Sequence, residues 1–462
     1  MADSAAATNR NDDSRVTRQH WRWTVLAAMA SYLDAGSIVA GASGLALWQQ
    51  YLGMSSTTVG LLGAFSSNAL STALGAIIGG RLGDLFGRKR IYQYDLLVYA
   101  FGILWIVFAF NVPMLFIGYI LVGLAVGADV PTSLALVGEF APSKARSRLM
   151  GLTQVAWSLG PIIALVLAFV LAPYEVFGIR LVFAHLAVVA LVTWVLRRGI
   201  VESARWTAAS GAGAAEATSD PSEQPEQAPV PSDPLAGRNL RNLFTGYTFK
   251  AILYTAVVYT FWNLAAGTYG FFLPYFLSTI GTESQGASVA LQSLWFFTTL
   301  VCVVLIFMPF GDGRHRRLIW GVGAACQIVA FLIFVFYPLS GESGFNIVAS
   351  IANIILFGIG AALAGEPFYK VWSQELFPTM LRTTAQGVTF AVARTSLGIW
   401  SFFVPVIAEA GFGGVALILV IFLTISGVVG LLFMPNTAGK SLEEIEAERS
   451  DDRAAATPGI AR

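Results

Sequence analysis

Long stretches without charge recur along the whole chain and constrain its fold more than any other feature. A helix needs about 20 apolar residues to cross the hydrocarbon core of a bilayer. Runs of that length predict about twelve transmembrane helices, divided evenly between two halves of the chain. They lie near residues 23–52, 57–80, 91–110, 113–136, 149–172 and 177–197, and near 249–279, 285–310, 318–337, 345–373, 385–408 and 412–434.

Composition supports a membrane protein and argues against several other classes. Only 12% of the residues are charged, against about 25% in ordinary globular domains. The net charge of +1 gives no basic domain for a nucleic-acid partner. Cys302 and Cys326 lie in apolar runs and are interpreted as packing residues. The sequence offers no metal cluster, nucleophile constellation or ATP-binding loop, so we expect no metal, no cofactor and no enzymatic activity.

A polar middle segment separates the two halves. Residues 207–245 are rich in Ala, Gly, Ser, Pro and acids, which is typical of a disordered linker. We therefore divide the chain into a six-helix bundle (1–206), a linker (207–245), a second six-helix bundle (246–434) and a tail (435–462). Basic residues concentrate in alternate loops, so the positive-inside rule places both termini and the linker in the cytoplasm.

The two halves repeat each other. Glu139, Pro142, Arg146, Gly151 and Thr153 recur at a constant offset of 236 residues, as Glu375, Pro378, Arg382, Gly387 and Thr389. Two units of the same topology fit a transporter that rocks two halves around a central site. A duplicated channel would carry a polar re-entrant segment, which the sequence lacks.

Several motifs carry a family resemblance. The stretch Gly80-Arg-Leu-Gly-Asp84-Leu-Phe-Gly-Arg88-Lys-Arg90 resembles the helix 2–3 loop of the major facilitator superfamily, although Leu85 replaces a usual basic residue. Gln154 and Gly160 after Arg146, the segment 201–206 and the segment 435–445 resemble the sugar porter family. The resemblance implies an all-α major facilitator fold and proton-coupled transport by alternating access.

The resemblance also implies a cytoplasmic gate, built from acids and arginines that hold one conformation closed. Taken singly, each residue is equally well explained as a helix cap or a weak surface ion pair; the repeated arrangement favours the gate. The set comprises Asp84, Arg88, Glu139, Arg146, Glu202 and Arg205 in the first half, and Asp312, Arg316, Glu375 and Arg382 in the second.

Three of the charges within the apolar segments need an explanation first, because a charge at the bilayer centre costs at least ~2.5–3.5 kcal/mol. Asp34 matches the helix 1 aspartate that proton-coupled sugar porters protonate, but Tyr119 stands where those porters place its arginine partner. Asp129 is a second candidate proton carrier. Arg394 is expected to bridge to Asp34 or Asp129; the alternative is a cation that faces an anionic substrate.

Amides and aromatic rings that suit polyhydroxy solutes gather in the predicted cavity, which we expect helices 1, 4, 5, 7, 8, 10 and 11 to line. Gln154 matches the substrate-binding glutamine of sugar porters. Glu366 and Lys370 lie four residues apart and can pair on one helix face. The candidate substrate-binding residues are Gln154, Asn263, Tyr269, Trp262, Trp157, Glu366 and Trp400.

The leading hypothesis is a proton-coupled secondary transporter that imports a sugar or a cyclic polyol such as an inositol. Alternatives are a symporter for an organic anion such as an aromatic acid, a facilitative uniporter and a non-transporting sensor. The predicted partners are the small-molecule substrate, protons and the lipid bilayer. We expect a multi-pass monomer in the cell membrane.

Overall fold

The computed structural model of the chain describes residues 16–448 with several gaps. Those gaps are 56–57, 59–60, 63, 66–68, 143–144, 199–206, 208–239, 245, 280–284, 339–342, 410–411 and 443. Most of the predicted linker and the tail beyond residue 448 therefore lie outside the described residues.

The described residues form helices and no strands. The first half contains α2 (Arg18–Leu52), α4 (Leu70–Phe86), α5 (Arg88–Val107), α6 (Val112–Phe140), α7 (Arg146–Leu171), a 3-10 turn (Ala172–Tyr174) and α8 (Glu175–Arg197). The second half contains a 3-10 turn (Leu240–Phe244), α11 (Gly246–Thr279), α12 (Gln285–Cys302), a π-helical turn (Val303–Phe307), α13 (Met308–Phe310), α14 (Arg316–Phe336), α15 (Ser343–Leu363), α16 (Glu366–Leu376), a 3-10 turn (Thr379–Leu381), α17 (Arg382–Glu409) and α18 (Phe412–Leu432).

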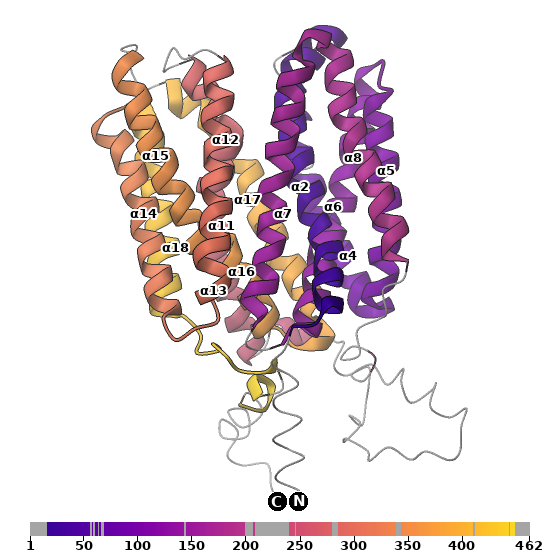
Figure 1. The fold of residues 1–462 in the computed structure, drawn as a ribbon, viewed down its shortest axis with the longest axis vertical. Coiled ribbons are helices and arrows are strands. Elements are labelled where there is room, and N and C mark those ends of the chain that lie inside the picture. The colour runs from indigo at the N-terminus through magenta and orange to yellow at the C-terminus, as the bar shows by residue number, and fades with distance from the viewer. Residues whose placement is uncertain are drawn as a thin grey trace, which may run out of the picture.

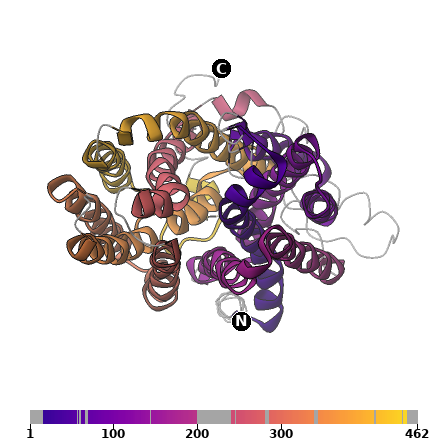
Figure 2. The same cartoon turned by 90° about the horizontal axis from the view of Figure 1, so that it is seen from above.

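These helices stand as two bundles side by side (Figures 1 and 2). The first bundle runs from α2 to α8 and the second from α11 to α18, and they meet where α4 packs on α17 and α7 packs on α12. The all-α fold with two helical bundles is confirmed. On length and composition alone, seven helical segments among the described residues qualify as membrane spans, and one of them, Arg146–Arg197, contains both α7 and α8.

The second helix ends later than its apolar run predicted. It continues to Phe86, so Gly80 and Gly83 lie inside α4 rather than in a surface turn, and Gly87 (φ 93°) alone makes the turn into α5. A Cβ on Gly80 would lie 2.5 Å from the backbone oxygen of Thr383 in α17. These glycines therefore permit close contact between the bundles, which a larger residue would prevent.

The tenth predicted segment, 345–373, is broken between α15 and α16. Pro367 stands in the first turn of α16, where its missing N–H is not needed, and Gly365 precedes that turn with a non-helical backbone (φ −144°, ψ −140°). The break directs α16 into the centre of the molecule, where all its residues are buried. It thereby positions Glu366 and Lys370 beside the first bundle.

Candidate functional site

A cleft of about 500 Å³, its open mouth included, lies between the two bundles. Residues of α2 and α7 line it from the first bundle, and residues of α11, α12, α16 and α17 from the second. Of the helices we expected, α6 (the predicted helix 4) contributes no lining residue in the described part of the chain. Bulky residues of α6 such as Tyr119 pack inside the first bundle instead.

One ion pair crosses between the bundles beside this cleft. A guanidinium nitrogen (Nη2) of Arg394 on α17 lies 3.5 Å from Oδ2 of Asp34 on α2, and both side chains are buried. Oδ1 of Asp34 has no hydrogen-bond donor in the described residues. The sequence predicted that Arg394 pairs with Asp34 or with Asp129, and in the structure it pairs with Asp34. The carboxyl retains one unsatisfied oxygen that can receive a proton.

A second polar link crosses the bundles next to that pair. Nζ of Lys370 donates a hydrogen bond to Oε1 of Gln154 on α7 at 2.9 Å. The same Nζ lies 3.6 Å from Oε1 of Glu366, one turn earlier on α16. Glu366 lines the cleft, whereas Gln154 and Lys370 do not. Both cations near the cleft thus have an acidic partner, which leaves the group electrically balanced.

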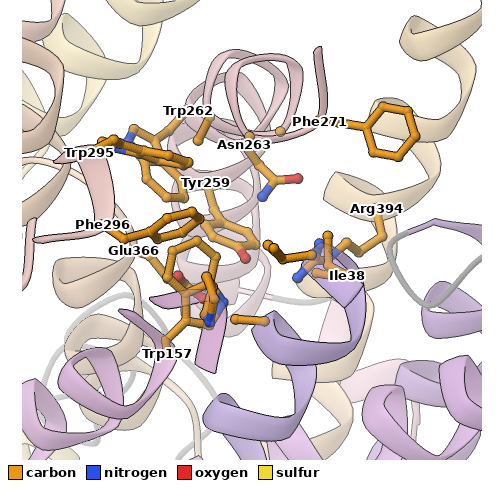
Figure 3. A pocket seen from close by; sticks show the side chains of 16 residues that line it. Ile38, Trp157, Tyr259, Trp262, Asn263, Phe271, Trp295, Phe296, Glu366 and Arg394 are labelled. Atoms are coloured by element: carbon orange, nitrogen blue, oxygen red, sulfur yellow. The ribbon is translucent and has the colours of Figure 1, made fainter. Parts of the chain in front are cut away.

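Aromatic rings form most of one wall of the cleft (Figure 3). Tyr259 stacks on Tyr369 with ring centroids 3.9 Å apart, and Trp157 packs against Phe296 at 5.6 Å. Arg394 faces this wall from the opposite side (Figure 3). Flat apolar faces of this kind suit the C–H surfaces of a ring-shaped solute.

Several polar atoms of this wall have no protein partner among the described residues; they include the hydroxyl of Tyr259 and Nε1 of Trp157 and Trp295. Oδ1 of Asn263 and Nε1 of Trp262 make no hydrogen bond among the described residues, and both side chains line the cleft. One is an acceptor and the other a donor. The pair can therefore bind a hydroxyl group, which both donates and accepts.

Two predicted substrate residues lie elsewhere. The hydroxyl of Tyr269 donates to Oδ1 of Asn353 at 2.6 Å, inside the second bundle. Nε1 of Trp400 donates to the hydroxyl of Thr268 at 2.7 Å. Neither residue lines the cleft.

Sequence reasoning also missed part of the wall. Tyr259 and the α12 pair Trp295 and Phe296 line the cleft, but no motif contains them. The spacing of Tyr259, Trp262 and Asn263 places all three on one helix face, a signal that could have revealed the first.

Asp129 is not near the cleft. Its Oδ2 accepts a hydrogen bond at 3.0 Å from Nη1 of Arg197, which is buried at the end of α8. Asp95 of α5 lies beside them, 3.7 Å from the same nitrogen. Arg394 therefore does not bridge to Asp129, and the sequence analysis missed both Asp95 and Arg197.

At the end of the molecule where α2 begins, which we call the basic end, two glutamates link the bundles in a repeated pattern. Oε1 of Glu139 contacts Arg88 of its own bundle at 3.0 Å and Arg382 of the other bundle at 2.9 Å. Glu375 contacts Arg316 of its own bundle at 3.0 Å and Arg146 of the other at 3.1 Å. Each glutamate thus joins one arginine from each bundle.

Two aspartates complete the pattern at helix N-termini. Asp84 forms a salt bridge with Arg88 at 3.2 Å and accepts a hydrogen bond from the backbone N–H of Thr384, at the start of α17, at 2.7 Å. Asp312 accepts one from the backbone N–H of Ser147, at the start of α7, at 2.8 Å. A carboxylate is stabilised at such a terminus by free N–H groups and the helix dipole. Glu202 and Arg205 of the predicted gate lie outside the described residues.

Comparison with known proteins places the chain among transporters. Residues 16–448 match the family described as Sugar (and other) transporter. The chain is 41% identical to the minor myo-inositol transporter IolF of Bacillus subtilis, covering 95% of each chain, and 24% identical to the glucose transporter GlcP of Staphylococcus epidermidis, covering 87% of this chain and 91% of GlcP. Its fold matches that of the major facilitator proton:xylose symporter XylE with a TM-score of 0.76 at 18% identity, covering 93% and 98% of the two chains.

Proposed function

The chain belongs to the sugar (and other) transporter family, and from that premise we propose that it moves a sugar or cyclic polyol together with a proton by alternating access. Membership makes it a multi-pass membrane transporter rather than an enzyme. The inositol transporter at 41% identity supports a cyclic polyol as the substrate class. We propose that it works as a monomer in the cell membrane.

The observation that carries proton coupling is the buried pair between Asp34 and Arg394. A proton on Asp34 would neutralise its charge and weaken the only ion pair in the described residues that joins α2 to α17. The two bundles would then be freer to move relative to each other. Hydration of the cleft on either side would favour release of the proton, because water stabilises the carboxylate.

The repeated links at the basic end support a state closed on that side. By the positive-inside rule this end faces the cytoplasm. Both interbundle glutamate–arginine pairs and both aspartate–helix contacts are made there. We therefore propose that the structure represents a state closed to the cytoplasm, from which the bundles rock to release substrate inward.

The charge balance of the cleft favours a neutral solute. Lys370 faces Glu366, and Arg394 faces Asp34, so neither cation is left to attract an anion. The unpaired groups of the cleft wall among the described residues are instead neutral, and they include the amide oxygen of Asn263, the hydroxyl of Tyr259 and the indole N–H of Trp262. An acid would have to displace a buried carboxylate from its partner, whereas a polyol needs only hydroxyl contacts.

Uptake into proteoliposomes tests this assignment. Labelled myo-inositol, hexoses and benzoate would be offered with and without an inwardly directed proton gradient. We expect a polyol or sugar to accumulate only with the gradient. Accumulation of benzoate alone would overturn the neutral substrate class, and polyol uptake that only equilibrates, with or without the gradient, would establish a uniporter.

A further inference from the structure

A second group of buried charges lies inside the first bundle, away from the cleft. Asp95 of α5, Asp129 of α6 and Arg197 of α8 are 6%, 4% and 0% exposed. Nη1 of Arg197 lies 3.0 Å from Asp129 and 3.7 Å from Asp95. None of the three lines the cleft. The proposed transport site therefore does not explain why two acids are buried here with one base.

Arg197 is held in place by hydrogen bonds to uncharged backbone oxygens, so Asp95 and Asp129 are its only acidic partners among the described residues. Its Nε and Nη2 donate to the backbone oxygen of Leu26 on α2 at 3.1 and 3.0 Å, and Nη1 also donates to the backbone oxygen of Tyr92. The guanidinium lies 3.6 Å above the Tyr92 ring. These contacts satisfy hydrogen bonds but add no charge, so the group has two carboxyls and one cation.

The hydrogen bonds of the two carboxyls differ. Asp129 accepts from Arg197 through Oδ2 and from Ser133 through Oδ1. Asp95 accepts from the backbone N–H of Leu96 at 2.5 Å through Oδ1, but its buried Oδ2 has no donor in the described residues. Oδ1 of Asp95 and Oδ2 of Asp129 lie 3.7 and 3.0 Å from the same Nη1 of Arg197, so the two carboxyl groups are neighbours that a direct hydrogen bond could join. Two carboxyl groups can form such a bond only when one is protonated.

We infer that Asp95 and Asp129 hold one proton between them, on Oδ2 of Asp95, as a second protonation site distinct from Asp34. With that proton the group is neutral: Asp129 pairs with Arg197, and Asp95 donates to a carboxylate. Without that proton, the two carboxylates and one guanidinium would leave a net negative charge buried, which costs free energy. Neighbouring carboxylates avoid this cost by sharing a proton. The inference rests on this geometry alone and does not depend on the proposed substrate.

Among the described residues, the contacts of this group include no second cation. α5 contributes Tyr92 and Asp95, α6 contributes Asp129 and Ser133, α8 contributes Arg197, and α2 contributes the backbone oxygen of Leu26. The site also contacts the helix that carries Asp34. Tyr99, one turn after Asp95 on α5, donates to the backbone oxygen of Leu33 at 3.0 Å. The shared proton thus stabilises the packing of α5 and α8 on α2.

Infrared spectroscopy of the purified protein detects the proton directly, because a protonated carboxyl absorbs apart from carboxylates and shifts in D2O. The parent would be Asp34→Asn at pH 8, so that Asp34 contributes no signal. We expect the difference spectrum between this parent and Asp34→Asn/Asp95→Asn to contain one protonated-carboxyl band. A difference spectrum without that band would overturn the inference.

Thermal unfolding of the same protein provides an independent test. Asp95→Asn replaces an already neutral group, so we expect a small fall in Tm at pH 7. Asp95→Asn/Asp129→Asn leaves Arg197 buried without a counter-charge, and its Tm should fall by more than the sum of the two single variants. A rise in Tm for Asp95→Asn at pH 7 would mean that both acids are ionised in the parent, because the substitution would then remove the excess negative charge, and would overturn the shared proton.

Discussion

Glu139→Gln tests the proposed gate at the basic end. Glu139 lies between Arg88 and Arg382 at 3.0 and 2.9 Å and is buried with both. The substitution keeps the size of the side chain but removes its charge, leaving two buried guanidinium groups with one acceptor fewer. Removal of one partner from a buried ion pair costs about 3–5 kcal/mol. In an inward-open state these groups would be hydrated, so the cost applies to the closed state.

The magnitude can be worked from these contacts. Gln retains a carbonyl oxygen, and Glu375–Arg146, Asp84 and Asp312 still join the bundles. We therefore take the lower end of the range. A loss of about 3 kcal/mol lowers the ratio of closed to open molecules by roughly a hundredfold, since every 1.4 kcal/mol is tenfold.

Spin labels on the two bundles can measure this shift. Exposed Arg90 and Arg314 at the basic end are suitable labelling positions, once Cys302 and Cys326 have been replaced. Distances measured by pulsed electron paramagnetic resonance should lengthen in Glu139→Gln.

The matched control is Glu448→Gln. It removes the same charge from an exposed pair with Lys440, worth about 0–1 kcal/mol, so it should leave the distances unchanged. If Glu139→Gln matches wild type as closely as this control does, the gate reasoning is wrong.

Two further predictions concern the substrate and the pH. Gln154→Ala removes a buried hydrogen-bonding partner, a loss of roughly 1–3 kcal/mol, and should raise the KM for a polyol by about five- to more than a hundredfold; uptake kinetics with an unchanged KM would contradict its role. Burial raises the pKa of Asp312 from 3.8 to about 6, an effect that outweighs the neighbouring Arg316. A proton therefore binds more tightly in the closed state, and this advantage is lost as the pH rises through 6. Lowering the pH from 7.5 to 5.5 should shift the spin-label distances toward closure in wild type but not in Asp312→Asn, and an equal shift in both would exclude Asp312 as the cause.

The helices could be predicted because the bilayer fixes their length. Arg197 was not recognised as a buried charge, because it ends an apolar run beside Arg198, a pattern that the positive-inside rule explains as a loop charge. Only the meeting of α5, α6 and α8 shows that it is buried with Asp95 and Asp129. A sequence gives the position of a charge along a helix, but not which neighbouring helices surround it.

The site was predictable where a helix face or a repeat constrained it. Tyr259 and Asn263 are four residues apart and therefore share one helix face, and both line the cleft. The repeat identified Glu139 and Glu375 as equivalent. It did not reveal that each joins arginines from both bundles, because that depends on how the two bundles pack.

Transport by Asp34→Asn in proteoliposomes tests proton coupling most directly. The substitution mimics a permanently protonated carboxyl and removes the charge that holds Arg394. We expect the variant to exchange labelled for unlabelled polyol across the membrane but to lose accumulation driven by a proton gradient, while Glu448→Gln retains both. Accumulation against a concentration gradient by Asp34→Asn would contradict the assignment of the coupled proton to Asp34.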